Sequence, residues 1–115
     1  TNTTYKEVLL TAAHSLAERF NAKVGMTRSW GSLHDESRFE VIIDNLMNLE
    51  LLFWAAVHSD NHTLYDIAES HVNRTGDVWV RNDGSTPHLC VFSPATGTLL
   101  LPCTGTPQGL SADST

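Results

Sequence analysis

The sequence predicts a mainly α-helical fold with a short β-hairpin region near the C-terminus. Apolar residues recur at helical spacing in residues 5–20, and they do so again in the long apolar stretch 41–57. A third periodic segment spans residues 64–72. From residue 78 onward the pattern changes to short apolar runs separated by turn residues, which is typical of strands. We therefore expect three helices followed by extended segments.

The first helix is predicted over residues 5–20 by a stripe at every fourth position. The members of this stripe are Val8, Ala12, Leu16 and Phe20. Residues 21–37 contain two glycines and little periodicity, so they predict a long loop with an exposed stretch at 28–31. Loops of this length commonly carry function when they are ordered.

The second helix, predicted over residues 41–57, is nearly hydrophobic on all sides. Such a helix is normally buried on most faces, and the other short elements offer too little surface to cover it. A third helix through residues 64–72 is expected to end near Gly76, since glycine commonly terminates helices.

The C-terminal third is expected to form short extended segments at residues 78–80, 88–92 and 99–101. Residues 82–85 predict a turn, and residues 93–97 predict an irregular hairpin loop. Cys90 and Cys103 lie 13 positions apart, a spacing that permits a disulfide without settling the compartment. Cytoplasmic and secreted locations both stay open.

Composition narrows the class of protein to a globular domain. The 115 residues are 41% hydrophobic and 17% charged, which is ordinary for a folded domain. The net charge of -6 lacks the basic surface that nucleic-acid phosphates require, so we expect no nucleic-acid partner. No apolar run approaches the ~18 residues of a membrane-spanning helix, so no membrane role is expected. The chain starts without Met, which suggests truncation or processing upstream.

Asp44 is the candidate for chemistry that the residues themselves single out. It lies with Asn45 and Asn48 in an otherwise apolar stretch, and Asp44 and Asn48 share one face of the predicted helix. Partial desolvation there would raise the pKa of the carboxyl, as a general acid requires. The alternative is a structural aspartate that caps the helix and satisfies its dipole.

Three other residues are weaker candidates. The Trp30 indole could stack on a sugar ring or could simply cover the core. His88 could hydrogen-bond a ligand or be a half-buried structural histidine, and Gln108 carries no signal of its own. The i, i+4 pair His58 and His62 is interrupted by a turn-like segment, so we expect neither a metal nor another cofactor.

Several blocks of the chain resemble the unsaturated glucuronyl hydrolases, glycoside hydrolase family 88. The most distinctive block is VIIDNLMNLELLFWA at residues 41–55. It is preceded by the loop at 28–30 and followed by YDIA at 65–68 with His71 and Thr75, RNDGSTPH at 81–88, SPATG at 93–97 and QGLSADST at 108–115. The resemblance therefore covers essentially the whole chain. Three positions depart from the family pattern: Pro87 replaces an aromatic residue, Ser93 an aspartate and Pro107 a histidine.

This resemblance implies an (α/α)6 barrel, of which residues 1–115 would be one slice: a partial glycoside hydrolase catalytic domain truncated at both ends. It implies that Asp44 is the general acid/base, that Trp30 stacks on the substrate, and that His88 and Gln108 bind the sugar. A second aspartate of the family would lie upstream of this chain.

The function implied by the resemblance is hydrolysis of lyase-generated oligosaccharides. The enzyme would remove the 4,5-unsaturated uronic acid from their non-reducing end by hydrating its vinyl ether. This oligosaccharide is the expected partner, and the oligomeric state stays open. The alternatives stay open as well: an unsaturated rhamnogalacturonyl hydrolase, or a non-catalytic truncated remnant or helical interaction module.

Overall fold

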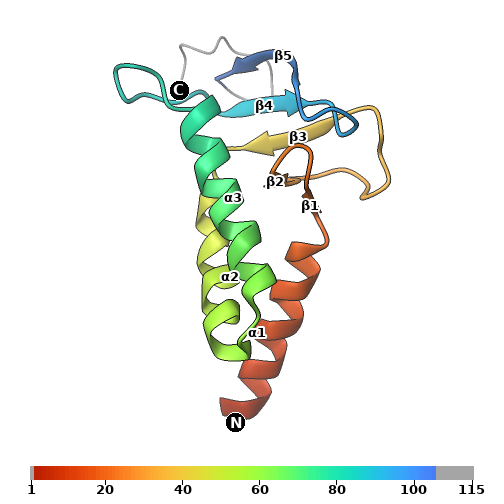
Figure 1. Cartoon of the computed structure of the whole chain (residues 1–115), viewed down its shortest axis with the longest axis vertical. Coiled ribbons are helices and arrows are strands. Elements are labelled where there is room, and N and C mark those ends of the chain that lie inside the picture. The colour runs from red at the N-terminus through yellow and green to blue at the C-terminus, as the bar shows by residue number, and fades with distance from the viewer. Residues whose placement is uncertain (1, 106–115) are drawn as a thin grey trace.

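The computed structural model describes residues 2–105, which form three helices and five short strands. Figure 1 shows the helices running along the long axis of the molecule while the strands gather at one end. The fold is therefore a mixture of helix and sheet. The prediction of a mainly α chain with only a hairpin was too narrow, because a strand from the middle of the sequence joins the C-terminal hairpin.

The first helix, α1 (Asn2–Ala17), is confirmed but ends before Phe20. It is followed by a small antiparallel hairpin of β1 (Phe20–Asn21) and β2 (Met26–Thr27), where a long loop was predicted. The side chain of Asn21 explains the difference, because it accepts hydrogen bonds from the backbone amides of Lys23 and Val24 and so closes a tight turn.

The apolar stretch predicted as one helix is divided into a strand and a helix. Strand β3 (Phe39–Ile42) ends just before α2 (Asn45–Ser59) begins. A short run of β-branched residues such as Val41 and Ile42 fits a strand as well as a helix, so periodicity alone could not separate them. Pairing of Val41 with Cys90 on the neighbouring strand decides in favour of the strand.

The third helix, α3 (His62–Val78), is longer than predicted and passes through Gly76 without stopping. Its start is capped by Asn61, whose side chain accepts from the Thr63 amide at 3.0 Å. At its other end Trp79 continues the turn, donating its backbone N–H to the Thr75 carbonyl at 2.9 Å. The predicted extended segment at 78–80 is thus wrong, because Trp79 anchors the end of a helix with a fully buried side chain.

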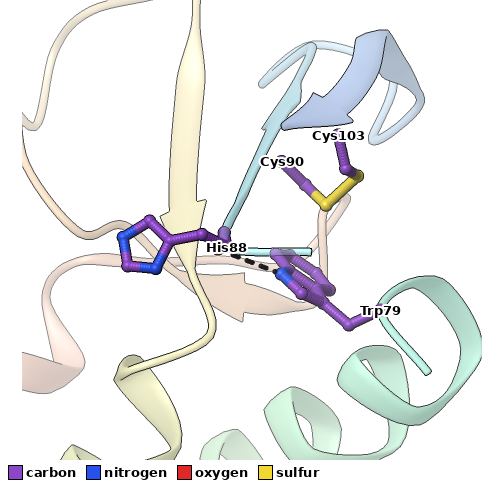
Figure 2. The surroundings of a disulfide bond; sticks show 4 residues. All are labelled: Trp79, His88, Cys90 and Cys103. Carbon is purple, nitrogen blue, oxygen red and sulfur yellow. Dashed lines mark hydrogen bonds between the residues drawn. A yellow bond between two sulfur atoms is a disulfide. The ribbon is translucent and has the colours of Figure 1, made fainter. Parts of the chain in front are cut away.

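The C-terminal hairpin is confirmed as β4 (Leu89–Phe92) and β5 (Leu99–Thr104). Together with β3 these strands form an antiparallel sheet in the order β3-β4-β5. Cys90 on β4 and Cys103 on β5 form the disulfide that their spacing permits, close to the buried ring of Trp79 (Figure 2). Covalent and hydrogen-bonded links therefore fix the edge strand β5 to the sheet.

Two clusters of buried apolar residues hold the described chain together. The helical core lies between the three helices, and the sheet core lies between the sheet, the β1–β2 hairpin and the end of α3. The helical core consists of Ala13, Leu49, Leu52, Ala55, Ala56, Leu64, Ile67 and Ala68. The sheet core consists of Val24, Met26, Phe39, Val41, Trp79, Cys90 and Phe92.

The helices also leave apolar side chains uncovered. On α2, Met47 is 80% exposed and Val57 is 76% exposed, and on α1 the predicted stripe residue Val8 is exposed while Ala13 is buried. α1 and α3 thus cover only part of the apolar surface that the sequence places on α2. Within residues 2–105, every helix falls short of the length and apolar character that crossing a membrane requires.

Candidate functional site

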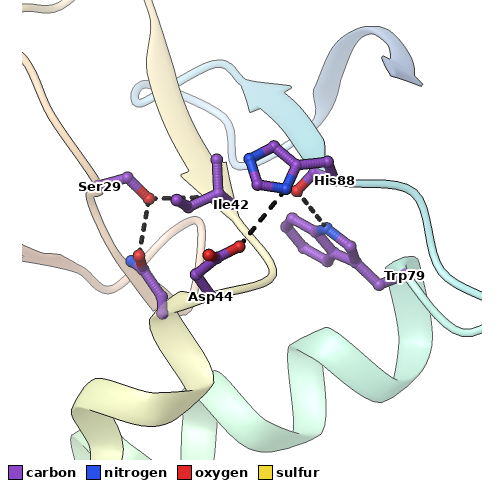
Figure 3. Close-up of polar contacts among 6 residues, drawn as sticks. Ser29, Ile42, Asp44, Trp79 and His88 are labelled. Carbon is purple, nitrogen blue, oxygen red and sulfur yellow. Dashed lines mark hydrogen bonds and ion pairs between the residues drawn. The ribbon is translucent and has the colours of Figure 1, made fainter. Parts of the chain in front are cut away.

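Asp44 and His88 meet at the junction between the sheet and the helices. Asp44 lies between β3 and α2, and His88 immediately precedes β4. The Asp44 Oδ1 atom is 3.4 Å from His88 Nδ1, and Figure 3 shows the two side chains facing each other. Two residues separated by 44 positions in the sequence are thereby brought together as an acid and an imidazole.

The Asp44 carboxylate does not cap α2, although Asp44 occupies the N-cap position. Its backbone is helical (φ -58°, ψ -22°), and its side chain makes no capping hydrogen bond. The amides of Leu46 and Met47 bond instead to the carbonyls of Ile43 and Asp44, at 3.1 and 3.0 Å. Because the first turn is satisfied by main-chain carbonyls, the carboxylate is available to His88 and to solvent.

The desolvation expected for Asp44 is not found within the described chain. Its side chain is 58% exposed, while that of His88 is 26% exposed. The expectation placed Asp44 inside an apolar helix, but the residue precedes the helix and lies at the surface. Asn48, one turn further along the same face, is also exposed and lines a groove of about 520 Å³ with Leu9, Met47 and Trp54.

The backbone of His88 is held from three directions. Its N–H donates to Thr104 of β5 at 2.8 Å, and its carbonyl accepts from the Ile43 N–H at 2.9 Å. The same carbonyl accepts from Nε1 of Trp79 at 3.3 Å, as Figures 2 and 3 show. The main chain around His88 is thus fixed by β5, by the end of α3 and by the residue before Asp44, while the imidazole faces the carboxylate.

Trp30 lies on the loop between β2 and β3. Its side chain is half-buried, and it follows Ser29, whose hydroxyl contacts both Ile42 and Asn45. The preceding Arg28 is buried rather than exposed as predicted. Its guanidinium lies over the Phe39 ring at 4.7 Å and donates to the carbonyls of Ser32 and Asp35. The Trp30 loop is therefore ordered by a buried arginine.

The remaining candidate, Gln108, lies outside the described residues, as does Pro107. The histidines considered for a metal site belong to different helices. His58 lies in the last turn of α2, with its Nδ1 2.8 Å from the Trp54 carbonyl, and His62 is the first residue of α3. The structure thus brings together two of the four proposed site residues, Asp44 and His88, and places Trp30 on an adjoining loop.

A buried polar group on α3, His71, was assigned no role from the sequence. His71 of α3 is 1% exposed, and burial lowers its pKa to about 4. Its Nδ1 lies 3.1 Å from both the backbone nitrogen and the hydroxyl of Thr27. Asn45 is buried too and bonds to the Thr27 carbonyl. The signal was the presence of Asn45 and His71 at inward helical positions, where a polar side chain must find a partner.

Comparison with known proteins shows which proteins this chain is similar to. No family model matches the chain. Over 95% of its length it is 40% identical to an unsaturated chondroitin disaccharide hydrolase of Streptococcus pneumoniae, and over 99% it is 38% identical to an unsaturated glucuronyl hydrolase of Formosa agariphila. These alignments span 27% and 28% of the two relatives.

Solved structures show the same relationship. The crystal structure of an unsaturated glucuronyl hydrolase from Bacillus sp. GL1, described as responsible for glycosaminoglycan degradation, superposes with a TM-score of 0.81 at 30% identity. It covers 90% of this chain and 28% of that protein. An Asp-to-Asn variant of such a hydrolase with dGlcA-Glc-Rha-Glc gives a TM-score of 0.79 at 31% identity, covering 87% of this chain and 27% of that one.

Sequence and fold together thus relate the chain to a class of carbohydrate-degrading hydrolases. Over nearly all of its length the chain is similar to part of the unsaturated glucuronyl hydrolases, which confirms the resemblance found in the sequence. It spans about a quarter of the length of the relatives that it matches.

Proposed function

We propose that the protein removes the 4,5-unsaturated uronic acid from the non-reducing end of lyase-generated oligosaccharides. The observation that carries this proposal is the uncapped Asp44 carboxylate facing His88 at 3.4 Å. The names of the relatives, which include unsaturated chondroitin disaccharide and glucuronyl hydrolases, support this substrate class over a rhamnogalacturonan-type one. The proposed partner is therefore an unsaturated uronic-acid oligosaccharide.

The proposed reaction is the hydration of a vinyl ether. Protonated Asp44 donates its proton to C4 of the unsaturated sugar, which leaves an oxocarbenium ion at C5. The resulting carboxylate accepts a proton from a water molecule as the water oxygen bonds to C5, so Asp44 returns to its starting state. The C5 hemiketal then opens, and the neighbouring sugar leaves from the opened ring.

Other residues would hold the substrate during these steps. His88 lies close enough to Asp44 to bind the same sugar, and its fixed backbone would keep the imidazole in place. Trp30 would stack on the apolar face of a sugar, with its half-buried indole partly available. Gln108 is proposed as a further sugar ligand from the family resemblance alone.

We also propose that residues 1–115 form a slice of an (α/α)6 catalytic domain. The superposition on unsaturated glucuronyl hydrolases supports this architecture. The exposed apolar side chains of α1 and α2, such as Val8, Met47 and Val57, are those expected of helices that pack against further helices.

The proposal is tested with Asp44→Asn in the full-length protein. Turnover is followed by the loss of ultraviolet absorbance from the conjugated double bond of an unsaturated chondroitin disaccharide. Removing the proton donor should lower kcat roughly 100-fold or more while substrate binding stays measurable. Asp60→Asn is the matched control, because Asp60 lies exposed at the other end of α2 in a left-handed conformation that asparagine tolerates.

Retained turnover by Asp44→Asn would remove Asp44 from the catalytic role. Faster turnover of an unsaturated rhamnogalacturonan-type disaccharide than of the chondroitin-type substrate would replace the proposed substrate class. A wild-type protein inactive on both would favour a non-catalytic role.

A further inference from the structure

The side chain of Asn45, the residue after Asp44, is buried with both ends of its amide hydrogen-bonded. It is 4% exposed. Its Nδ2 donates to the Thr27 carbonyl at 3.0 Å, and its Oδ1 accepts from the Ser29 hydroxyl at 2.9 Å. Asn45 therefore ties the first residue of α2 to the segment that leaves β2.

The direction of these hydrogen bonds follows from the chemistry of the groups. The Ile42 N–H can only donate, and it does so to Ser29 Oγ at 2.9 Å, as Figure 3 shows. The single hydroxyl proton of Ser29 is then available for Asn45 Oδ1. The Thr27 carbonyl can only accept, so it must face the amide nitrogen of Asn45. The orientation of the Asn45 amide is thereby determined.

The same chain of hydrogen bonds continues to α3. The Thr27 N–H can only donate, so the Nδ1 atom of His71, 3.1 Å away, must be an unprotonated acceptor. A chain of hydrogen bonds thus runs from α3 through the β2 segment to the end of β3. We call it the relay, and its members are His71, Thr27, Asn45, Ser29 and Ile42. Every link involves a group that can only donate or only accept, or a hydroxyl whose role is then fixed.

This relay fixes the backbone on one side of Asp44, and His88 fixes it on the other. On the preceding side, Ile43 donates its N–H to the His88 carbonyl at 2.9 Å. On the following side, Asn45 is held by Thr27 and Ser29. Since both neighbours are held and the Asp44 side chain caps nothing, its position relative to His88 depends on these two anchors.

We propose that Asn45 is a positioning residue for Asp44, acting through the buried hydrogen bonds to Thr27 and Ser29. This inference rests on the proposed catalytic role of Asp44. Loss of the Asn45 amide would let the first turn of α2 shift, and small displacements of a catalytic group are costly to the chemical step. The effect should fall on kcat rather than on KM, because Asn45 is buried and directs the acid.

The test uses Asn45→Ala in the full-length protein, with turnover of an unsaturated chondroitin disaccharide. We expect kcat to fall roughly 10- to 100-fold with KM changed less than about threefold. Leu52→Val is the control, because Leu52 is fully buried in the same helix but belongs to the helical core, away from the relay. It should lower the Tm while leaving kcat near that of the wild type.

A second pair of variants separates positioning from packing. Ser29→Ala removes the hydroxyl that Asn45 accepts from and should lower kcat in the same way, whereas Ser29→Thr keeps a hydroxyl and should recover most of the loss. Hydrogen exchange of the Leu46 and Met47 amides gives a readout independent of turnover, and it should accelerate in Asn45→Ala and not in Leu52→Val.

Unchanged kcat in Asn45→Ala, or an equal loss in Leu52→Val, would overturn the positioning role. So would unchanged exchange of the Leu46 and Met47 amides in Asn45→Ala. A wild-type protein without turnover would instead count against the proposed function, and the exchange measurement would still decide whether Asn45 holds the first turn.

Discussion

The sheet end and the helical end of the molecule bury their apolar side chains to different extents. The largest side chains of the sheet core, Trp79, Phe39 and Phe92, are at most 1% exposed. Four of the eight residues in the helical core are alanines, and Met47 and Val57 on α2 remain mostly exposed. The sheet end therefore removes more apolar surface from water per buried residue.

This difference explains where the candidate site lies. His88 and the residue before Asp44 are both bonded to the tightly packed sheet end, through Trp79, Thr104 and each other. The helical end supplies the first turn of α2 but leaves much of its own surface uncovered. The 3.4 Å distance between Asp44 and His88 depends on fixed backbone positions, which the packed sheet core provides.

The largest expected effect on stability is that of Trp79→Ala, which removes the largest side chain of the sheet core. Deleting this buried indole removes its packing against Phe92, at 5.8 Å between ring centroids, and its hydrogen bond to the His88 carbonyl. The free energy of unfolding should fall by about 3–5 kcal/mol. Urea denaturation followed by circular dichroism measures it.

Met47→Ala is the matched change at the helical end. Met47 is 80% exposed, so in the 115-residue chain its truncation should alter the free energy of unfolding by no more than about 0.5 kcal/mol. Equal losses of unfolding free energy in Trp79→Ala and Met47→Ala would contradict the difference in packing between the sheet end and the helical end.

The sequence predicted the parts of this architecture that depend on local patterns. The positions of three helices, the turn near residue 83, the hairpin loop at 93–97 and the possibility of the Cys90–Cys103 disulfide all agree with the structure. The division of the apolar stretch into β3 and α2 was not predictable in this way. Its β-branched residues suit either state until pairing with β4 is known.

The candidate site, too, was only partly predictable from the sequence. Asp44 was singled out as a carboxylate in an apolar stretch, but its surface position follows from the strand that precedes it. The Asp44–His88 contact and the relay through Asn45 join residues from separate elements. Such contacts depend on tertiary packing, which the spacing of residues along the chain does not specify.

His71, which joins α3 to the sheet end, should make the free energy of unfolding depend on pH. Burial lowers its pKa from 6.5 to about 4 in the folded protein. Above pH 6.5 it is neutral in both states, and its contribution to stability is complete. As the pH falls from 6.5 to 4, the unfolded chain binds a proton that the folded protein resists, so up to about 3 kcal/mol of stability is lost.

His71→Asn isolates this contribution. The asparagine Oδ1 can replace Nδ1 as the acceptor for the Thr27 N–H, and it does not titrate. The difference in unfolding free energy between wild type and variant should therefore shrink as the pH is lowered through this window. A difference that stays constant between pH 7 and pH 4 would contradict a buried neutral His71.

A further comparison concerns the loop that links the β4–β5 hairpin to the β1–β2 turn, where the side chain of Asn21 donates to the Pro94 carbonyl. Gly97 has φ +78°, and a Cβ placed there would lie 2.0 Å from the Lys23 carbonyl oxygen. Gly97→Ala should therefore lower the free energy of unfolding by about 2 kcal/mol or more, through backbone strain and a clash with main chain. Gly84 has φ +87° but open space around it, so Gly84→Ala should show the strain alone, about 1 kcal/mol. Thermal denaturation of the two variants measures the difference, and equal losses would show that the close approach of Gly97 to Lys23 contributes nothing to the sheet end.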